Sequence, residues 1–550
     1  MIVDFEQTDG PISRQGTVCV IGAGAGGIAL ALELARLGLS VTLLESGGLE
    51  QEEATQALCA SEVTGLPHDG IHAGRFRVLG GTTTQWGGQI LELDQHDFEV
   101  RPWIPGSGWP FSKPALGPYY KRALEIEGLT AGLHDDGAVW EAIRSPQPAL
   151  DASLEPFFTR WCPEPNFAQL FRSHLRDDSQ ITVILHANVC EILLAQGQQT
   201  IAGVRCRSLG GRSAIFTADQ YAFCLGGIET ARLLLQPLSG GGTGPWNASG
   251  LTGRFFQDHI DSTLIEVLPR QRRQLHQWFD NIYRSGFKYQ PKLKLSAAAQ
   301  TRLQCLGIGA SFVFLSHKSK SLSEFREMAA QLRRGLVSPM ELARQIRHLR
   351  LRRLSDAGLL IRQAIRFKLQ GRAYNPDDAG IFLRLHCEQA PNADSRITLT
   401  TDRDAIGMLR CRLDWRVTGL EIETIRHFSR VIHESFTTCG LADTCTHAWL
   451  QAGGLELISH FDDSYHHMGA TRMASSPRAG VVDPDLRLFG IRNGHVCSSS
   501  VFPTSGFSNP THTLIALAAR LAEHLAADVS RDEAHLADAS HLRVPLLTKV

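Results

Sequence analysis

The sequence lacks the cysteine patterns that hold metals or form a disulfide framework. Its 12 cysteines are scattered, with no Cys-x-x-Cys pair and no grouping of cysteine and histidine at zinc spacing. Cys19 and Cys224 fall in apolar, strand-like runs, where a reduced thiol packs as a small hydrophobic side chain. We therefore expect no disulfides, no iron–sulfur cluster and no metal site.

The chain also has no excess of charge of one sign and no long apolar run. It carries 55 Lys and Arg against 56 Asp and Glu, a net charge of -1, which gives no overall attraction for nucleic acid or an anionic membrane. No apolar run is long enough to cross a bilayer, and residues 1–16 have neither the basic nor the apolar part of a signal peptide. We expect a cytoplasmic protein of more than one domain, with no transmembrane segment and no nucleic-acid partner.

A nucleotide-binding pattern lies near the start of the chain. Residues 18–21 predict a short strand, residues 28–37 have helical apolar spacing, and residues 40–44 predict a second strand. The turn before the helix reads G-x-G-x-x-G, with its glycines at Gly22, Gly24 and Gly27. This context favours a dinucleotide-binding βαβ unit over an incidental glycine turn, which is the alternative for such a motif.

Each glycine of this turn has a physical role in such a unit. Gly22 permits the tight turn, Gly24 lets the backbone approach a pyrophosphate, and Gly27 lets the helix pack on the strand. Glu45 closes the second strand at the separation expected of a carboxylate that binds the adenosine ribose. These residues leave open whether the dinucleotide is NAD or FAD.

Further glycine-rich segments follow. Residues 75–88, RFRVLGGTTTQWGG, form a loop whose bare backbone allows a flat ligand to approach, although a long surface loop is the alternative. Residues 186–192 predict a strand, and residues 221–229 predict a strand that runs into a Gly-Gly turn before a helix. We interpret these segments as separated pieces of one nucleotide-binding domain.

The C-terminal segments are the most specific. Residues 465–473 read YHHMGATRM, and residues 498–512 read SSSVFPTSGFSNPTH. They follow three earlier segments: the glycine turn at Gly22, the loop of residues 75–88 and the Gly-Gly turn of residues 221–229. Together these five segments match five sequence patterns, in order and along nearly the whole chain. In these patterns the chain resembles the glucose-methanol-choline (GMC) oxidoreductase family of FAD-dependent enzymes that oxidise alcohols. The resemblance is to the divergent branch around pyranose oxidase and the bacterial FAD-dependent sugar dehydrogenases.

The resemblance implies FAD as the cofactor and a set of residues that contact it. These positions are Gly22, Gly24, Gly27, Glu45, Gly81, Thr83, Trp86, Gly87, Val189, Gly226, Ser500 and Pro510. Relatives with covalent FAD carry a histidine directly before the tryptophan of the glycine loop. Here Gln85 stands there, so the resemblance implies noncovalent FAD. The chain also departs from the family at Ala470, where threonine is usual, and at Ser498, where many members have aspartate.

Oxidation of an alcohol by a flavin needs a base for the hydroxyl proton and a group that holds the oxygen. The family pattern implies His466 as the base and Asn509 as the hydrogen-bond donor. His467 stays an alternative, because adjacent residues of a strand face opposite sides, and His512 is a third candidate for the pocket. Any of the 22 histidines could instead be a core or solvated side chain, and Asn509 could cap the last helix.

A basic segment lies outside the family pattern. Residues 317–372 contain 14 Lys and Arg against 4 Asp and Glu, with apolar residues at helical intervals. We predict two or three amphipathic helices that pack on the substrate domain and present a solvated basic face. Docking of an acidic partner, contact with a membrane surface and a lid over the substrate are the alternatives.

We therefore predict an α/β fold with a Rossmann-type FAD-binding domain assembled from discontinuous segments. These segments are residues 16–94, 181–256 and 481–528. An α+β substrate domain takes residues 95–180 and 257–480 and includes the helical insert.

Two further expectations concern a part of the substrate domain and the C-terminal residues. Residues 381–414 alternate between apolar and polar and predict antiparallel strands along one wall of the pocket. Residues 530–550 lack periodicity and predict a mobile tail.

The predicted function is an FAD-dependent oxidase or dehydrogenase that acts on a CH–OH group of a sugar, aminosugar or polyol-like alcohol. Oxygen, a quinone or a protein would accept the electrons. Two alternatives come from other classes: an FAD-containing enzyme like the hydroxynitrile lyases, and the flavoprotein subunit of an electron-transfer dehydrogenase complex.

Overall fold

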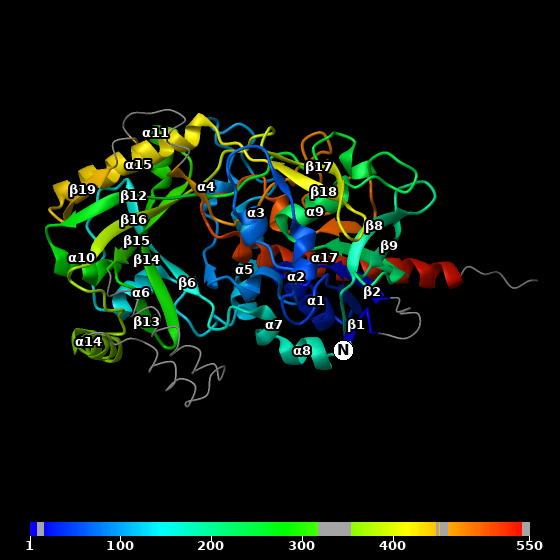
Figure 1. Cartoon of the computed structure of the whole chain (residues 1–550), viewed down its shortest axis with the longest axis horizontal. Helices are drawn as coiled ribbons and strands as arrows, with labels where there is room; N and C mark the ends of the chain where they lie inside the picture. The colour runs from blue at the N-terminus through cyan, green and yellow to red at the C-terminus, as the bar shows by residue number, and fades with distance from the viewer. Residues whose placement is uncertain (8–15, 317–353, 447–449, 451–459, 542–550) are drawn as a thin grey trace, which may run out of the picture.

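The computed structural model of the chain describes residues 1–7, 16–316, 354–446, 450 and 460–541. It contains two large sheets of different kinds, and Figure 1 shows them side by side, with the antiparallel strands at the left and β1 and β2 at the right. No helix in this part of the chain is long and apolar enough to cross a membrane.

The first sheet is parallel, in the order β1-β7-β3-β2-β11-β21. Its strands are β1 (Ile2–Asp4), β2 (Gly16–Ile21), β3 (Val41–Leu44), β7 (Ile181–Leu185), β11 (Ala218–Phe223) and β21 (Gly494–Val496). Three of them are almost wholly buried and mostly apolar, as expected of parallel strands covered on both faces. The predicted fold class is confirmed, because strands from distant parts of the chain build one Rossmann-type sheet.

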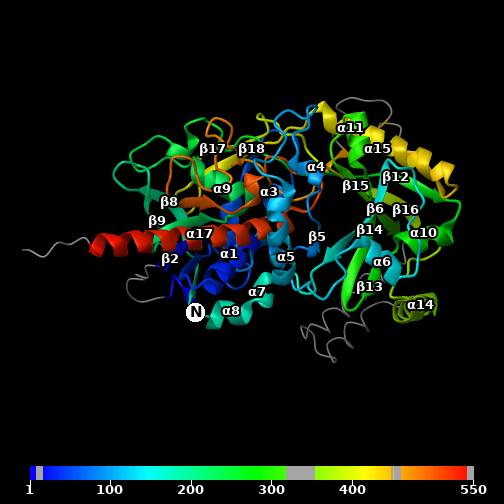
Figure 2. The same cartoon turned by 180° about the vertical axis from the view of Figure 1, so that it is seen from behind.

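Two helices leave this sheet through glycine turns, and a third packs on one of them. α1 (Ala25–Arg36) leaves the glycine turn after β2, and α9 (Gly226–Leu235) leaves the Gly-Gly turn after β11. α17 (Pro510–His541) packs on α1 and on α5 (Gly117–Ile126), and Figure 2 shows it running alongside them. α17 continues into the predicted tail as far as His541, because this alanine-rich stretch favours helix, and the mobility of the tail stays a prediction. Residues 542–550 lie outside the described part.

The strand predicted at residues 186–192 is β8 (Asn188–Leu194). It does not join the parallel sheet but forms a three-stranded antiparallel sheet with β9 (Ile201–Arg207) and β10 (Ser213–Phe216).

The second large sheet is antiparallel and follows the path β19-β12-β16-β15-β14-β6-β5, with β13 and β20 at its sides. Its strands are β5 (Gln89–Ile90), β6 (Leu154–Trp161), β12 (Ile260–Pro269), β13 (Ile282–Arg284), β14 (Phe287–Leu295), β15 (Ile308–Leu315), β16 (Gly380–Cys387), β19 (Ala442–Thr446) and β20 (Asp462–Asp463). α15 (Gly419–Thr438) begins with a Thr418–Glu421 capping box and packs along it.

The two faces of this sheet differ in polarity. Leu293 and Leu385 belong to an apolar cluster with side chains of α15. The register sets Asp261 opposite His386, and Lys292 opposite Ser311, on the other face. Because side chains alternate along a strand, this second face is the polar one.

The prediction that residues 381–414 form one wall is wrong in part. Only β16 lies in the large sheet. β17 (Arg396–Arg403) and β18 (Leu409–Asp414) form a separate sheet with β4 (Glu62–Val63). The chain turns away after β16 because Glu388 is bound by Arg101 and the Gln389 side chain accepts a hydrogen bond from Trp415 Nε1.

Most of the basic insert, residues 317–353, lies outside the described residues. Its described end contains α14 (Leu354–Gln370), which agrees with a helical insert. α14 exposes Ile361, Ile365 and Leu369, so its outer face is partly apolar and not the purely basic face that we expected.

A buried ion pair ties the segment after α4 (Gln95–Phe98) to the antiparallel sheet. Arg101 Nη1 and Nη2 bind the two carboxylate oxygens of Glu388 at 2.8 and 2.5 Å, and both side chains are fully buried. Glu388 Oε2 also accepts a hydrogen bond from the Gly307 backbone at 2.8 Å. The pair is bidentate, and neither side chain is exposed to solvent.

Arg101→Leu should therefore lower the free energy of unfolding by about 3–5 kcal/mol, because it leaves the Glu388 carboxylate buried and unpaired. The matched control is Arg412→Leu. Its partner Glu62 lies at the same kind of distance, 2.9 Å, but both side chains are more than two-fifths exposed, so the loss should stay within about 1 kcal/mol. Chemical denaturation of both variants checks this, and similar losses in the two would contradict it.

Candidate active site

Segments far apart in the sequence meet at the carboxyl ends of the parallel strands. Gly22 has a φ of +101°, and a Cβ on Gly27 would lie 1.8 Å from the Gly22 carbonyl oxygen, so both positions require glycine. The loop of residues 75–88 lies against this turn. The Gly80 backbone donates to the Ala23 carbonyl at 2.9 Å, and a Cβ on Gly81 would lie 2.9 Å from the Gly24 Cα.

Gly24 differs from these tightly packed glycines. A Cβ there would meet no protein atom within 4 Å, so the space beside the start of α1 is open. Backbone N–H groups at the start of a helix bind phosphate oxygens. The open position of Gly24 therefore fits a pyrophosphate group that approaches the backbone.

Glu45 lies buried at the end of β3. Its carboxylate accepts hydrogen bonds from the backbone of Ala23 and Gly47, each at 2.9 Å, and burial raises its pKa. A small cavity next to it is lined by Gly22, Ser46 and Val189, among others. The structure thus brings Val189 of β8 to the same place as the first glycine of the motif.

Three other predicted FAD contacts lie nearby. Gly226 begins α9 with a φ of +79°, and a Cβ on its neighbour Gly227 would lie 2.4 Å from the His467 carbonyl oxygen. Ser500 is buried and accepts a hydrogen bond from Thr471 Oγ1 at 2.6 Å. Pro510 is the first residue of α17.

Three predicted contacts lie in and after the second glycine loop. Thr83 is buried, and its hydroxyl donates to the Gly80 carbonyl at 2.6 Å. Trp86 donates from Nε1 to the Pro165 carbonyl at 2.7 Å, and a Cβ on Gly87 would lie 2.7 Å from the Trp161 ring. Trp86 and Gly87 therefore pack beside β6, apart from the first turn.

His466 and Asn509 are in direct contact. His466 Nε2 lies 3.0 Å from Asn509 Nδ2, although the two residues are 43 positions apart. The His466 backbone N–H donates to Asp258 Oδ1 at 2.9 Å, which holds this segment against the start of β12. The structure therefore brings together the two residues that the sequence analysis selected for catalysis.

His259 is a further member of this site, and the sequence analysis did not find it. Its Nδ1 lies 2.9 Å from His466 Nδ1, and the two rings meet edge to face. With the Asn509 amide as donor, His466 Nε2 is an acceptor without a proton, and Nδ1–H donates to His259. No motif marks His259, because its partner is 207 positions away.

Burial keeps both rings neutral. Desolvation, with smaller contributions from His259 and His386, holds the pKa of His466 well below its usual value of 6.5. Desolvation likewise lowers the pKa of His259 to about 4. At neutral pH His466 Nε2 carries no proton, and its lone pair accepts the hydrogen bond from Asn509.

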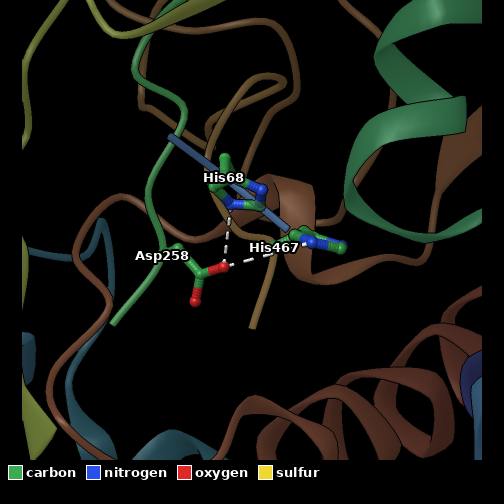
Figure 3. Close-up of side chains that lie close together, drawn as sticks. All are labelled: His68, Asp258 and His467. Carbon is green, nitrogen blue, oxygen red and sulfur yellow. Dashed lines mark hydrogen bonds and ion pairs between the residues drawn. The ribbon is translucent and has the colours of Figure 1, made fainter. Parts of the chain in front are cut away.

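His467 lies beside His68 and Asp258 (Figure 3). Its Nε2 lies 4.0 Å from Asp258 Oδ2, its ring packs on His68 at 5.4 Å, and its pKa is lowered by burial. His68 Nδ1 accepts from the Ile71 backbone, so Nε2–H donates to Asp258 Oδ2 at 3.1 Å. The two adjacent histidines thus lie in separate surroundings, and only His466 contacts Asn509.

His68, Asp258 and His467 are close enough to hold a metal ion, with their ligand atoms within 4.8 Å of one another. The hydrogen bond between His68 and Asp258 accounts for two of the three without a metal. The absence of a metal site stays a prediction.

His512 lies elsewhere. Its Nδ1 contacts Glu127 Oε2 at 2.7 Å, and its ring stacks on Tyr120 of α5 at 5.2 Å. The first turn of α17 directs this fully buried side chain into the contact with α5, away from His466.

The polar face of the antiparallel sheet begins at His259. Asp261 follows two positions later, so it lies on the same face, and it pairs with His386 Nδ1 at 2.5 Å. Lys292 of β14 lies on this face too, and burial lowers its pKa to about 8. These side chains offer donors and acceptors to a hydroxyl-rich molecule.

The chain matches two family models. The model described as GMC oxidoreductase matches residues 391–518, which include His466 and Asn509, and the model described as FAD dependent oxidoreductase matches residues 17–162, which include the first glycine turn.

Full-length relatives and solved structures are similar at low identity. The chain is 23% identical to a 2-methyl-1,2-propanediol dehydrogenase of Mycolicibacterium austroafricanum, over 96% of both chains. It is 24% identical to a paromamine 6'-oxidase of Streptomyces fradiae, over 94% of this chain and 93% of the relative. A formate oxidase structure aligns with a TM-score of 0.55 at 16% identity, covering 95% of this chain and 99% of that one. A pyridoxine 4-oxidase from Mesorbium loti aligns with a TM-score of 0.55 at 17% identity, covering 92% and 98%.

The fold, the open glycine turn and these matches define the chain as an FAD-dependent oxidoreductase. The resemblance to GMC oxidoreductases that its motifs indicated is confirmed, since that family model matches the C-terminal residues 391–518.

Gly24→Val should greatly reduce the FAD content of the purified protein, because its side chain would fill the open space beside the start of α1. Gly419→Val is the matched control. A Cβ on Gly419 also meets no protein atom within 4 Å, but it lies at the start of α15. The ratio of flavin to protein absorbance measures both variants. Normal FAD occupancy in Gly24→Val would refute this placement of the pyrophosphate.

Proposed function

We propose that the chain oxidises a CH–OH group of a sugar, aminosugar or polyol-like alcohol, with His466 as the base. The contact between His466 Nε2 and Asn509 Nδ2 at 3.0 Å carries this proposal. A substrate oxygen that takes the place of this direct contact would lie within hydrogen-bond reach of both nitrogen atoms.

The protein residues divide the work at that oxygen. His466 Nε2, neutral and without a proton, accepts the hydroxyl proton. Asn509 Nδ2 donates a hydrogen bond to the same oxygen and fixes its position. The hydrogen bond from His466 Nδ1 to His259 orients the ring and faces the positive charge that develops on it. Bound FAD supplies the acceptor, at flavin N5, for the hydride that leaves the carbon.

Two observations support the substrate class. The similar proteins are named for a diol, for the aminoglycoside paromamine and for pyridoxine. In this chain, Asp261, His386 and Lys292 give the wall next to His259 several hydrogen-bonding groups. We propose noncovalent FAD, because Gln85 lacks the imidazole of relatives with a covalent bond. Oxygen, a quinone or a protein remains the proposed electron acceptor.

His466→Ala should leave FAD bound but slow flavin reduction by about two to four orders of magnitude, the usual contribution of a positioned general base. His467→Ala is the matched control, because it removes the adjacent ring from a site that does not contact Asn509. Anaerobic rapid mixing with a panel of sugars, aminosugars and polyols first identifies a substrate and then measures each variant.

The outcomes separate the alternatives. Asn509→Ala should also slow reduction, with little loss of FAD. If His467→Ala is the impaired variant and His466→Ala is not, the base is wrongly assigned. A wild-type protein that consumes a cyanohydrin without reducing its flavin would instead support the lyase alternative.

The rate of flavin reduction should fall at low pH. His466 must be unprotonated, and its lowered pKa keeps it so at neutral pH. The rate should therefore stay constant from neutral pH down to 6.5 and fall only at lower pH, as the ring gains its proton. Stopped-flow reduction across this range measures the profile. A half-maximal rate at or above pH 6.5 would contradict it, and the residual rate of His466→Ala should lack the step.

A further inference from the structure

A second cavity lies on the opposite face of the antiparallel sheet from His259. It has a volume of about 840 Å3 and is lined by residues near α6 (Asp136–Ala142), α10 (Arg272–Phe279), β13 and α14. Figure 1 shows α6, β13 and α14 together at the end of the molecule farthest from β1 and β2. Tyr289 of β14 lines it, whereas Lys292, three positions along the same strand, lies on the catalytic face.

Arginines dominate the lining of this cavity. Five of them reach it from separate parts of the chain, and no carboxylate lines it: Arg144, Arg273, Arg284, Arg366 and Arg372. Among the described residues only Arg366 has a carboxylate partner, Asp280, at 2.7 Å. Arg284, Arg366 and Arg372 lie close enough to act on one another, and Asp280 is the one carboxylate among the described residues that pairs with any of the five.

Arg372 is the most informative of the five. Only 6% of it is exposed, and its guanidinium makes no hydrogen bond or ion pair with any residue in the described ranges. Burial lowers its pKa to about 10, against the opposing effect of the nearby Asp280 carboxylate and with smaller contributions from Arg366 and Arg284. A buried guanidinium without an acceptor is costly, and an oxyanion is the ligand that its planar donors match.

We infer that this cavity is a binding site for a small molecule with several oxyanion groups, such as a polyphosphate or a phosphorylated metabolite. Its volume lies in the range of small-molecule sites, about 300–1,000 Å3, and is too small for a folded partner. Planar guanidinium forks bind phosphate oxygens in pairs, so several arginines suit a ligand with more than one phosphate. The site is independent of the proposed oxidation, because the sheet separates it from His259 and His466.

Calorimetric titration of the FAD-loaded full chain with inorganic tripolyphosphate tests this inference. The wild type should bind, and the double variant Arg273→Gln, Arg284→Gln should bind at least about tenfold more weakly, because it loses two charge-assisted contacts. Arg430→Gln is the matched control, an exposed arginine on α15 outside the cavity, and should bind like the wild type. All three should keep the same FAD content and the same rate of flavin reduction.

Thermal melting gives a second measurement that does not depend on the double variant. Tripolyphosphate should raise the Tm of the wild type and not that of Arg372→Met, whose Tm without the probe should be unchanged or higher because a buried unpaired charge is removed. Absence of binding to the wild type overturns the inference. So does an equal loss in Arg430→Gln, which would mean binding to the general surface charge. Tighter binding of hexaglutamate than of tripolyphosphate would also overturn it, by showing a site for an acidic peptide.

Discussion

The Asp258 carboxyl group holds the centre of the molecule together. Its Oδ1 accepts the backbone N–H groups of His259 and His466, and its Oδ2 accepts His68 Nε2–H, all with the side chain fully buried. This one group therefore joins the start of the antiparallel sheet to the segment that carries both adjacent histidines. Because the backbone of His466 is held, His466 must face Asn509 while His467 faces His68. The pairing of Gln257 with Met468, at 2.9 and 2.8 Å between backbones, continues the same contact.

Burial sets the protonation state of the histidines around Asp258. The histidine rings have few charged neighbours of opposite sign and lie out of water, so desolvation keeps His466, His467 and His259 neutral. A neutral His466 with a hydrogen-bonded Nδ1 has the tautomer that a base needs at Nε2. The same low polarity strengthens the hydrogen bonds to Asn509 and His259. Burial thus leaves His466 Nε2 unprotonated, even though the Asp258 carboxylate lies next to the His466 backbone.

The antiparallel sheet separates two kinds of chemistry. Its polar face continues from His259 through Asp261 and His386, which form an ion pair. On the opposite face, the apolar cluster under α15 gives way near β13 to the cavity with five arginines. Alternation of side chains along β14 places one residue on the polar face and another at the cavity. Lys292 and Tyr289 lie three positions apart and therefore on opposite faces. A two-sided sheet of this kind can hold a second ligand without disturbing the first.

Local patterns in the sequence predicted the βαβ unit, the resemblance to GMC oxidoreductases and the pair His466 and Asn509. Gly22, Gly24 and Gly27 act within one turn, and the two proposed catalytic residues lie in short motifs, so neighbouring residues carry that information. Only the tertiary structure determined the contacts of His259 and Asp258 and the lining of the arginine cavity. The partners in each case are far apart in the sequence, and only the register of the sheet brings them together. The tertiary structure also decided that residues 396–414 leave the large sheet, because buried contacts of Glu388 and Gln389 override a strand pattern that is the same in either sheet. Periodicity reports which face of an element is buried, but not which distant element covers it.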